Sequence, residues 1–174
     1  MIFMPVNHRV SGALVLLAAL LWALAACTPS DQAHFSIVRA EAQPMAELVK
    51  ANPSTWQTPG SPLITSDDLA AYTWATHEME LTPEAYERLR ALAVPVDGLP
   101  FVVRVGDETI YRGALWTPIS SLSYEGIVIM QPFDPAGRTV RLELGYPSPQ
   151  FARGEDPRSD GRIRAALEQA GKLR

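Results

Sequence analysis

The chain has 174 residues, and 47% of them are hydrophobic, which is enough to bury the core of one domain of ordinary size. Its formal net charge is −4 at pH 7 and it has no long basic run, which argues against nucleic acid or an anionic lipid surface as the main partner. The one cysteine excludes an internal disulfide, a c-type haem and an iron–sulfur cluster.

That cysteine, Cys27, directly follows a long apolar run. Arg9 gives the start of the chain a positive charge, and residues 10–26 are rich in Leu and Ala, as in a secretory signal. The stretch LAAC that ends at Cys27 resembles the lipobox of bacterial lipoproteins, in which the cysteine is acylated on sulfur and the peptide is cut before it. We therefore expect a signal peptide over 1–26, a lipidated cysteine and tether over 27–33, and a single domain over 34–174.

The resemblance to lipoproteins also implies a location. Two or three acyl chains on Cys27, palmitate among them, would anchor the protein stably in a lipid bilayer. The alternative is an uncleaved transmembrane or anchor helix over 10–26, because a helix spans a bilayer with about 17–25 apolar residues. Both interpretations place the rest of the chain at a cell membrane, outside the cytoplasm, facing the periplasm or the cell exterior.

Strands are expected where apolar residues alternate with polar ones or where β-branched residues cluster. These segments are 34–39, 77–81, 101–105, 108–112, 127–130 and 139–144. Gly106 and Asp107 suit a two-residue hairpin turn between two of them. Short helices are expected at 45–51 and just after Thr65, the second of only one or two turns because strand-forming aromatic residues follow it.

Two helices carry clear start signals. Thr82 and Pro83 read as an N-cap and a first helical residue, so we expect a helix over 83–92 that buries Leu89. Asp160 reads as the N-cap of a last helix over about 160–171, which has apolar residues at helical spacing. Together the elements predict an α+β domain: a small antiparallel sheet with two or three helices packed on one face.

The central region carries a second resemblance. The stretches MELTPEAYERL and GLPFVVRVGDETIY resemble the head of the first periplasmic domain of the protein-export factor SecD, over roughly residues 65–131. This implies a SecD-like fold; it implies no export activity, because the bundle of transmembrane helices found in SecD is missing from the sequence. A YxGxxW-xxxSS stretch and a DPR-containing tail are also similar to those of small bacterial lipoproteins whose family has no established function.

The sequence contains no recognisable catalytic set, and we expect no cofactor. Ser120, Ser121 and Ser123 lack the glycines of a nucleophile elbow and the lysine of a Ser-x-x-Lys motif. His34 and His77 have no metal-ligand spacing, and we interpret His77 as a buried structural histidine. A hydrolase is therefore the least favoured function.

The acidic residues in the segment 155–160 suggest a calcium site. Counted from Asp156, the third position of an EF-hand loop is Arg158, which breaks the motif. We interpret Asp160 as a helix cap and Arg158 as a residue that holds the turn. A cation at 155–160 stays as an alternative.

The loop 113–126 is the best candidate for a working surface. Aromatic residues in a loop can form a partner surface or a ligand cleft, and here they can also simply close the sheet. The candidate residues are Tyr111, Trp116, Ser120, Ser121 and Tyr124. The sequence thus favours a non-enzymatic lipoprotein that binds a protein partner beside a membrane complex, and the alternative is a lipoprotein that binds a small ligand or cation.

Overall fold

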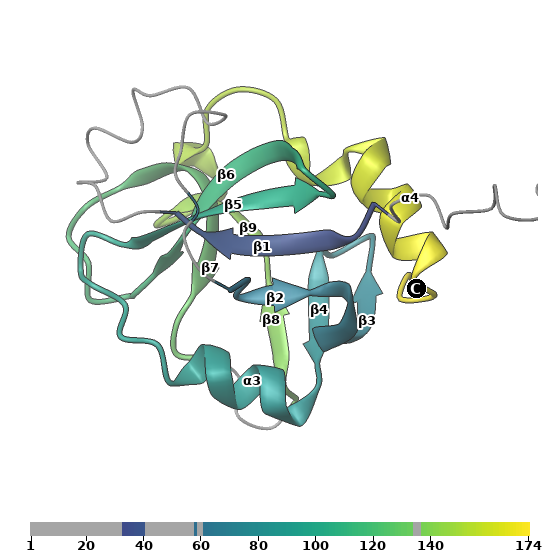
Figure 1. Ribbon diagram of the computed structural model, residues 1–174. Helices are drawn as coiled ribbons and strands as arrows, with labels where there is room; N and C mark the ends of the chain where they lie inside the picture. The colour runs from purple at the N-terminus through teal and green to yellow at the C-terminus, as the bar shows by residue number, and fades with distance from the viewer. Residues whose placement is uncertain (1–32, 41–57, 59–60, 134–136) are drawn as a thin grey trace, which may run out of the picture. The chain divides into compact units, whose positions relative to one another are not determined.

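Two β-sheets and two α-helices make up the part of the chain that the computed structural model describes, residues 33–40, 58, 61–133 and 137–174 (Figure 1). The expected signal peptide, Cys27, almost all of the tether and the helix at 45–51 lie outside these residues. None of the described helices is long and apolar enough to cross a bilayer. The domain is therefore α+β, as the sequence predicted.

The larger sheet has six strands in the order β2-β1-β5-β6-β7-β9. The expected antiparallel pairing holds for every neighbouring pair except β6 and β7, which run parallel. The wholly antiparallel prediction is therefore wrong at this pair. The strand bounds are Phe35–Arg39 for β1, Ile64–Thr65 for β2, Leu99–Val105 for β5, Glu108–Trp116 for β6, Tyr124–Met130 for β7 and Glu143–Tyr146 for β9.

The parallel pair explains the length of the loop 117–123. A hairpin needs as few as two residues, whereas a parallel partner must start again at the far end of the strand. Trp116 at the end of β6 lies opposite Met130 at the end of β7, so the chain has to run back before β7 begins at Tyr124. The loop is a short crossover between parallel strands.

The smaller sheet has the order β3-β4-β8, with β3 at Leu69–Thr73, β4 at Glu78–Leu81 and β8 at Thr139–Arg141. The sequence predicted one strand over 139–144, but buried Leu142 divides it between the two sheets. The last residues of the chain run beside β3, where the Tyr72 N–H donates to the carbonyl of Lys172 at 2.7 Å.

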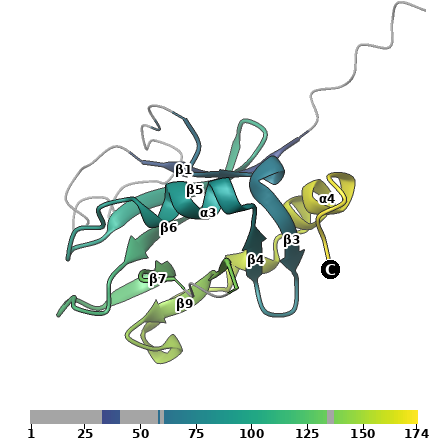
Figure 2. The ribbon, with the colours of Figure 1, turned by 90° about the horizontal axis from the view of Figure 1, so that it is seen from below.

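Both α-helices begin where their caps predicted. In α3 (Pro83–Arg90) the Thr82 hydroxyl accepts from the N–H of Ala85, and in α4 (Gly161–Gln169) the Asp160 carboxylate accepts from the N–H of Arg162. A 3-10 turn, η3 (Ser66–Asp68), replaces the short helix expected after Thr65. Viewed from below, α4 lies next to β3 and the C-terminal end of the chain, and α3 lies apart from α4 (Figure 2).

The core forms two clusters because successive residues of β5 point to opposite faces of the sheet. Phe101 and Val103 join the main cluster, to which both α-helices and the smaller sheet contribute. Val102 joins a second cluster with Ala114, Trp116, Tyr124 and Val128. The six-stranded sheet is thus buried on both faces, and residues 33–174 form one compact unit.

Candidate functional site

A pocket of about 580 Å³ lies where β6 and β7 begin. The two strands pair from Gly113↔Ile127 onward, and before that point the described ladder does not join them. The carbonyl of Glu125 instead accepts from the N–H of Arg153 at 3.1 Å. We call this pocket the slot; it is lined by residues 110–112 and 123–127 and by Leu144, Arg153, Glu155 and Pro157.

A β-bulge shapes one wall of the slot. Val103 pairs with Tyr111 and Arg104 with Thr109, so Ile110 is an extra residue in β6. Bulges bend a strand and redirect its side chains, and they are common beside functional sites. Here the bulge immediately precedes Tyr111, which lines the slot and belongs to the main core cluster.

Tyr111 lines the slot, but its hydroxyl is buried in the main core cluster and has almost no accessible surface. Its side chain is 6% exposed, and its hydroxyl has no hydrogen-bond partner among the described residues. Burial raises the pKa of this hydroxyl well above its usual range, with smaller effects from Tyr72, Arg158 and Asp156. The group is therefore a neutral phenol, able to donate or accept a hydrogen bond. Most buried polar groups are paired, so an unpaired one indicates a missing partner or a functional role.

The charged residues near this hydroxyl are already paired with each other. Asp156 accepts from the backbone N–H of Arg158 and from its guanidinium, and Arg158 Nη1 also donates to the carbonyl of Leu142 at 2.7 Å. The hydrogen bonds from Arg158 lower the pKa of Asp156, so the carboxylate is ionised. The pair is neutral as a whole and leaves Tyr111 without a partner.

Tyr72 and His77 form a second buried pair close by. The Tyr72 hydroxyl lies 3.1 Å from Nδ1 of His77, and His77 is 7% exposed with a positive φ of 53°. Burial lowers the pKa of His77, and nearby Arg158 lowers it further. The structural role expected for His77 agrees with this geometry. His34 is exposed directly before β1.

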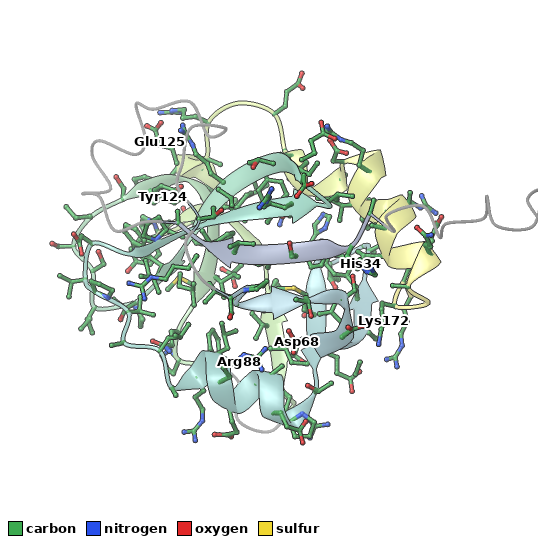
Figure 3. All side chains as sticks on the ribbon, in the orientation of Figure 1. His34, Asp68, Arg88, Tyr124, Glu125 and Lys172 are labelled. Carbon is green, nitrogen blue, oxygen red and sulfur yellow. The ribbon has the colours of Figure 1, made fainter. Side chains whose placement is uncertain are left out.

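The mouth of the slot carries both signs of charge. Arg153 and Glu125 form a loose ion pair, with Nε 3.9 Å from Oε1 and both side chains more than half exposed. Glu155 lines the same mouth and forms no ion pair with the residues described. Figure 3 shows Tyr124 and Glu125 close to each other and well away from the ion pair between Asp68 of η3 and Arg88 of α3.

The five candidate residues divide into three groups. Tyr111 and Tyr124 both line the slot, although they are separated by the crossover. Ser120 is buried and its hydroxyl accepts from the N–H of Leu122, as in a turn, while Ser121 is exposed. Trp116 lies in the second core cluster.

The prediction that Trp116 is a contact residue on the surface is wrong. Trp116 is 1% exposed, and its ring stacks on Tyr124 at 5.4 Å and lies 5.8 Å from the ring of Tyr146. The Tyr146 hydroxyl donates to the carbonyls of Pro118 and Ser120, which holds the crossover against this aromatic group. Trp116 therefore closes the sheet, which was the competing interpretation.

The acids at 155–160 are used mainly within the chain. Asp156 is paired with Arg158, and Asp160 caps α4 and pairs with Arg162 at 2.6 Å. Across the described ranges, no three His, Cys, Asp or Glu side chains gather in a way that could hold a metal ion. The geometry thus gives no support to the calcium alternative.

Sequence reasoning missed Ile110, Arg153 and the exposed apolar residues of the crossover. Ile119 is 78% exposed and Leu122 is 52% exposed, while the aromatic residues that flank them are buried. The signal available in the sequence was that Ile119 and Leu122 are isolated apolar residues in a segment otherwise rich in Ser and Pro. No protein-family model, curated protein or solved structure matches the chain.

Proposed function

We propose that this protein is a membrane-anchored, extracytoplasmic lipoprotein that binds a small molecule in the slot and catalyses no reaction. The single observation that carries the ligand is the pocket of about 580 Å³ itself, which combines apolar walls at Ile110, Ile127 and Leu144 with the charged side chains of Arg153 and Glu125. Pockets of about 300–1,000 Å³ with apolar walls and a few polar groups are typical of small-molecule sites. The slot also joins the two segments, 111–124 and 155–160, that the sequence offered for ligand binding.

The proposed anchor rests on the sequence around Cys27. The apolar run 10–26, the LAAC stretch and the absence of a second cysteine all favour acylation of this residue. Cys27→Ser should move the protein to the soluble fraction or leave it as an unprocessed precursor. An unmodified cysteine in the intact mass of the mature wild-type protein would overturn the anchor.

The finer fold assignment is also a proposal. The order β4, α3, β5, turn, β6 supports a likeness to the head of the SecD periplasmic domain. Side chains of α3 and α4 share one core cluster, which supports helices packed on one side of the larger sheet. We place the signal or anchor helix before this domain.

A blocked slot tests the proposed binding. Ile110 is half-buried in the slot wall, so Ile110→Trp should fill the pocket, whereas Thr109→Trp adds the same side chain at the preceding position, which does not line it. Ligands are sought by adding each compound of a library of neutral and zwitterionic metabolites and measuring the change in the midpoint of thermal unfolding. A saturable rise in midpoint for the wild type and Thr109→Trp, lost in Ile110→Trp, is expected; the proposal fails if every stabilising compound acts equally on both variants.

Binding of a protein partner is the second candidate function. Ile119 and Leu122 expose apolar side chains on the crossover, and exposed apolar residues are frequent at interfaces. Capture from solubilised membranes should weaken in Ile119→Ser if the crossover contacts a partner. Val96→Ser is the control, because Val96 is an exposed apolar residue in another loop. Equal capture by both variants would rule out the crossover as the contact.

A further inference from the structure

We propose that residues 41–57 of this chain dock on the side of the six-stranded sheet that carries the second core cluster. We call that side the second face and define it by Val38 of β1, Val102 of β5, Ala114 and Trp116 of β6 and Val128 of β7. This docking surface is separate from the function proposed for the slot and does not depend on it.

The second face is buried although no described helix packs on it. Val102, Ala114 and Val128 come from three neighbouring strands, and each is 0% exposed. Neither a described helix nor a described strand of the smaller sheet contributes an apolar side chain to the second cluster. The apolar side chains of α3 and α4 belong to the main cluster instead. Since an apolar sheet face is buried only against another layer, a further part of the chain covers it.

Two buried donors on the second face indicate that this layer also carries polar groups. Nε1 of Trp116 and Nε of Arg104 are buried and have no hydrogen-bond partner among the described residues. Arg104 follows Val102 by two positions in β5, so its side chain points to the same face. Its Nη2 donates to the carbonyl of Asp107 at 2.8 Å, which leaves Nε to be satisfied. Buried donors are nearly always paired, so the covering layer supplies acceptors.

The places where the chain leaves and rejoins the described part favour residues 41–57 as this layer. Ala40 is 1% exposed and belongs to the second cluster, so the chain departs from the second face itself. It returns at Thr58 and continues into β2, which pairs with β1. The face is four strands wide, or about 14 Å at about 4.8 Å per strand spacing. An extended chain reaches about 3.3–3.6 Å per residue, so residues 41–57 can cross this width and return.

The sequence of residues 41–57 has the composition that the second face requires. Met45, Leu48 and Val49 are spaced by three and four positions, which gives the helix expected at 45–51 one apolar side. Glu41 and Glu47 offer acceptors for buried donors. The shorter undescribed stretches, 59–60 and 134–136, are too short to cover four strands.

Removing the apolar residues of the segment tests the docking. In the full chain in detergent, Met45→Ser, Leu48→Ser and Val49→Ser are combined, and oxidation of side chains by hydroxyl radicals is located by mass spectrometry. We expect Trp116 and Tyr124 on the second face to be oxidised severalfold faster than in the wild type.

The matched control changes polar residues of the same segment. Glu47→Ser, Lys50→Ser and Asn52→Ser are combined, and this variant should protect Trp116 and Tyr124 like the wild type. Phe35 and Tyr72, which are 0% exposed in the main cluster, report whether a variant still folds. If the apolar variant folds and Trp116 and Tyr124 stay protected, residues 41–57 do not cover the second face and the proposal is overturned.

A crosslink in the otherwise wild-type chain decides the question even where the apolar variant fails to fold. A photoreactive benzophenone amino acid replaces Arg104, whose side chain is 26% exposed at the border of the second face. Mass spectrometry of the irradiated protein should find the crosslinked peptide within residues 41–57 of the same chain. The same substitution at Arg141, in β8 of the smaller sheet, is the control and should give no such peptide. Crosslinks from position 104 only to other segments, or to a second copy of the chain, would overturn the proposal.

Discussion

Replacing Tyr111 by Phe should stabilise the protein when no ligand is present. The hydroxyl is buried without a partner among the described residues, so the folded state carries a desolvation cost that the variant lacks. An unsatisfied buried polar group costs about 1–3 kcal/mol, and removing one oxygen leaves the ring contacts in place. We therefore expect the free energy of unfolding to rise by about 1–3 kcal/mol, or about 2–4 °C in midpoint for each kcal/mol.

Tyr72→Phe is the matched control for this experiment. Tyr72 is also fully buried, but its hydroxyl lies 3.1 Å from Nδ1 of His77, so removing it breaks a hydrogen bond and should lower stability by about 1–3 kcal/mol. Both variants are compared with the wild type by thermal unfolding, followed by circular dichroism in one buffer. If Tyr111→Phe melts at or below the wild-type temperature, the hydroxyl already has a partner, and the reasoning from its unpaired burial is refuted.

Three further predictions concern the core and its pH dependence. Leu89→Ala should cost about 2–5 kcal/mol, because Leu89 is buried between α3 and the sheets; a urea-denaturation change below about 0.5 kcal/mol would mean that the site is not core. Trp116→Ala should cost about 3–5 kcal/mol by the same assay, and a stable variant would contradict the burial of its ring. Burial lowers the pKa of His77, so below about pH 6.5 the unfolded chain binds a proton that the folded chain does not, and stability should fall between pH 7 and 5 by up to about 1.4 kcal/mol per pH unit. His77→Asn, which tolerates the positive φ, should flatten that fall; an unchanged slope would exclude His77 as its source.

The parts of the fold that local chemistry decides could be predicted from the sequence. Thr82-Pro83 and Asp160 start helices because each side chain satisfies a backbone N–H of its own first turn, a contact between residues two or three positions apart. The hairpin between β5 and β6 follows in the same way from Gly106, which has a positive φ of 58°. Such signals require no knowledge of the rest of the chain.

Pairings between distant segments could not be predicted in that way. The segment 139–144 reads as one strand, yet Leu142 directs its two ends into different sheets because each end meets a different partner, β4 or β7. The parallel pairing of β6 and β7 is equally invisible, since the loop 117–123 has the length of an irregular hairpin. Misreading that loop led directly to the wrong expectation for Trp116, whose ring is buried where the crossover passes.

The site follows from the same parallel pair. At Gly113, where β6 and β7 first pair, a Cβ atom would lie 2.6 Å from the carbonyl of Ile127, so only glycine lets the strands approach there. At Gly126 a Cβ atom would lie 2.8 Å from the ring of Tyr124, so any larger residue would displace that ring from the position in which it stacks on Trp116. One glycine therefore allows β6 and β7 to pair next to the residues that line the slot, and the other leaves room for Tyr124, which lines it. Both would read from the sequence as ordinary loop or strand glycines, because the atoms that exclude a side chain come from the folded ring and the neighbouring strand.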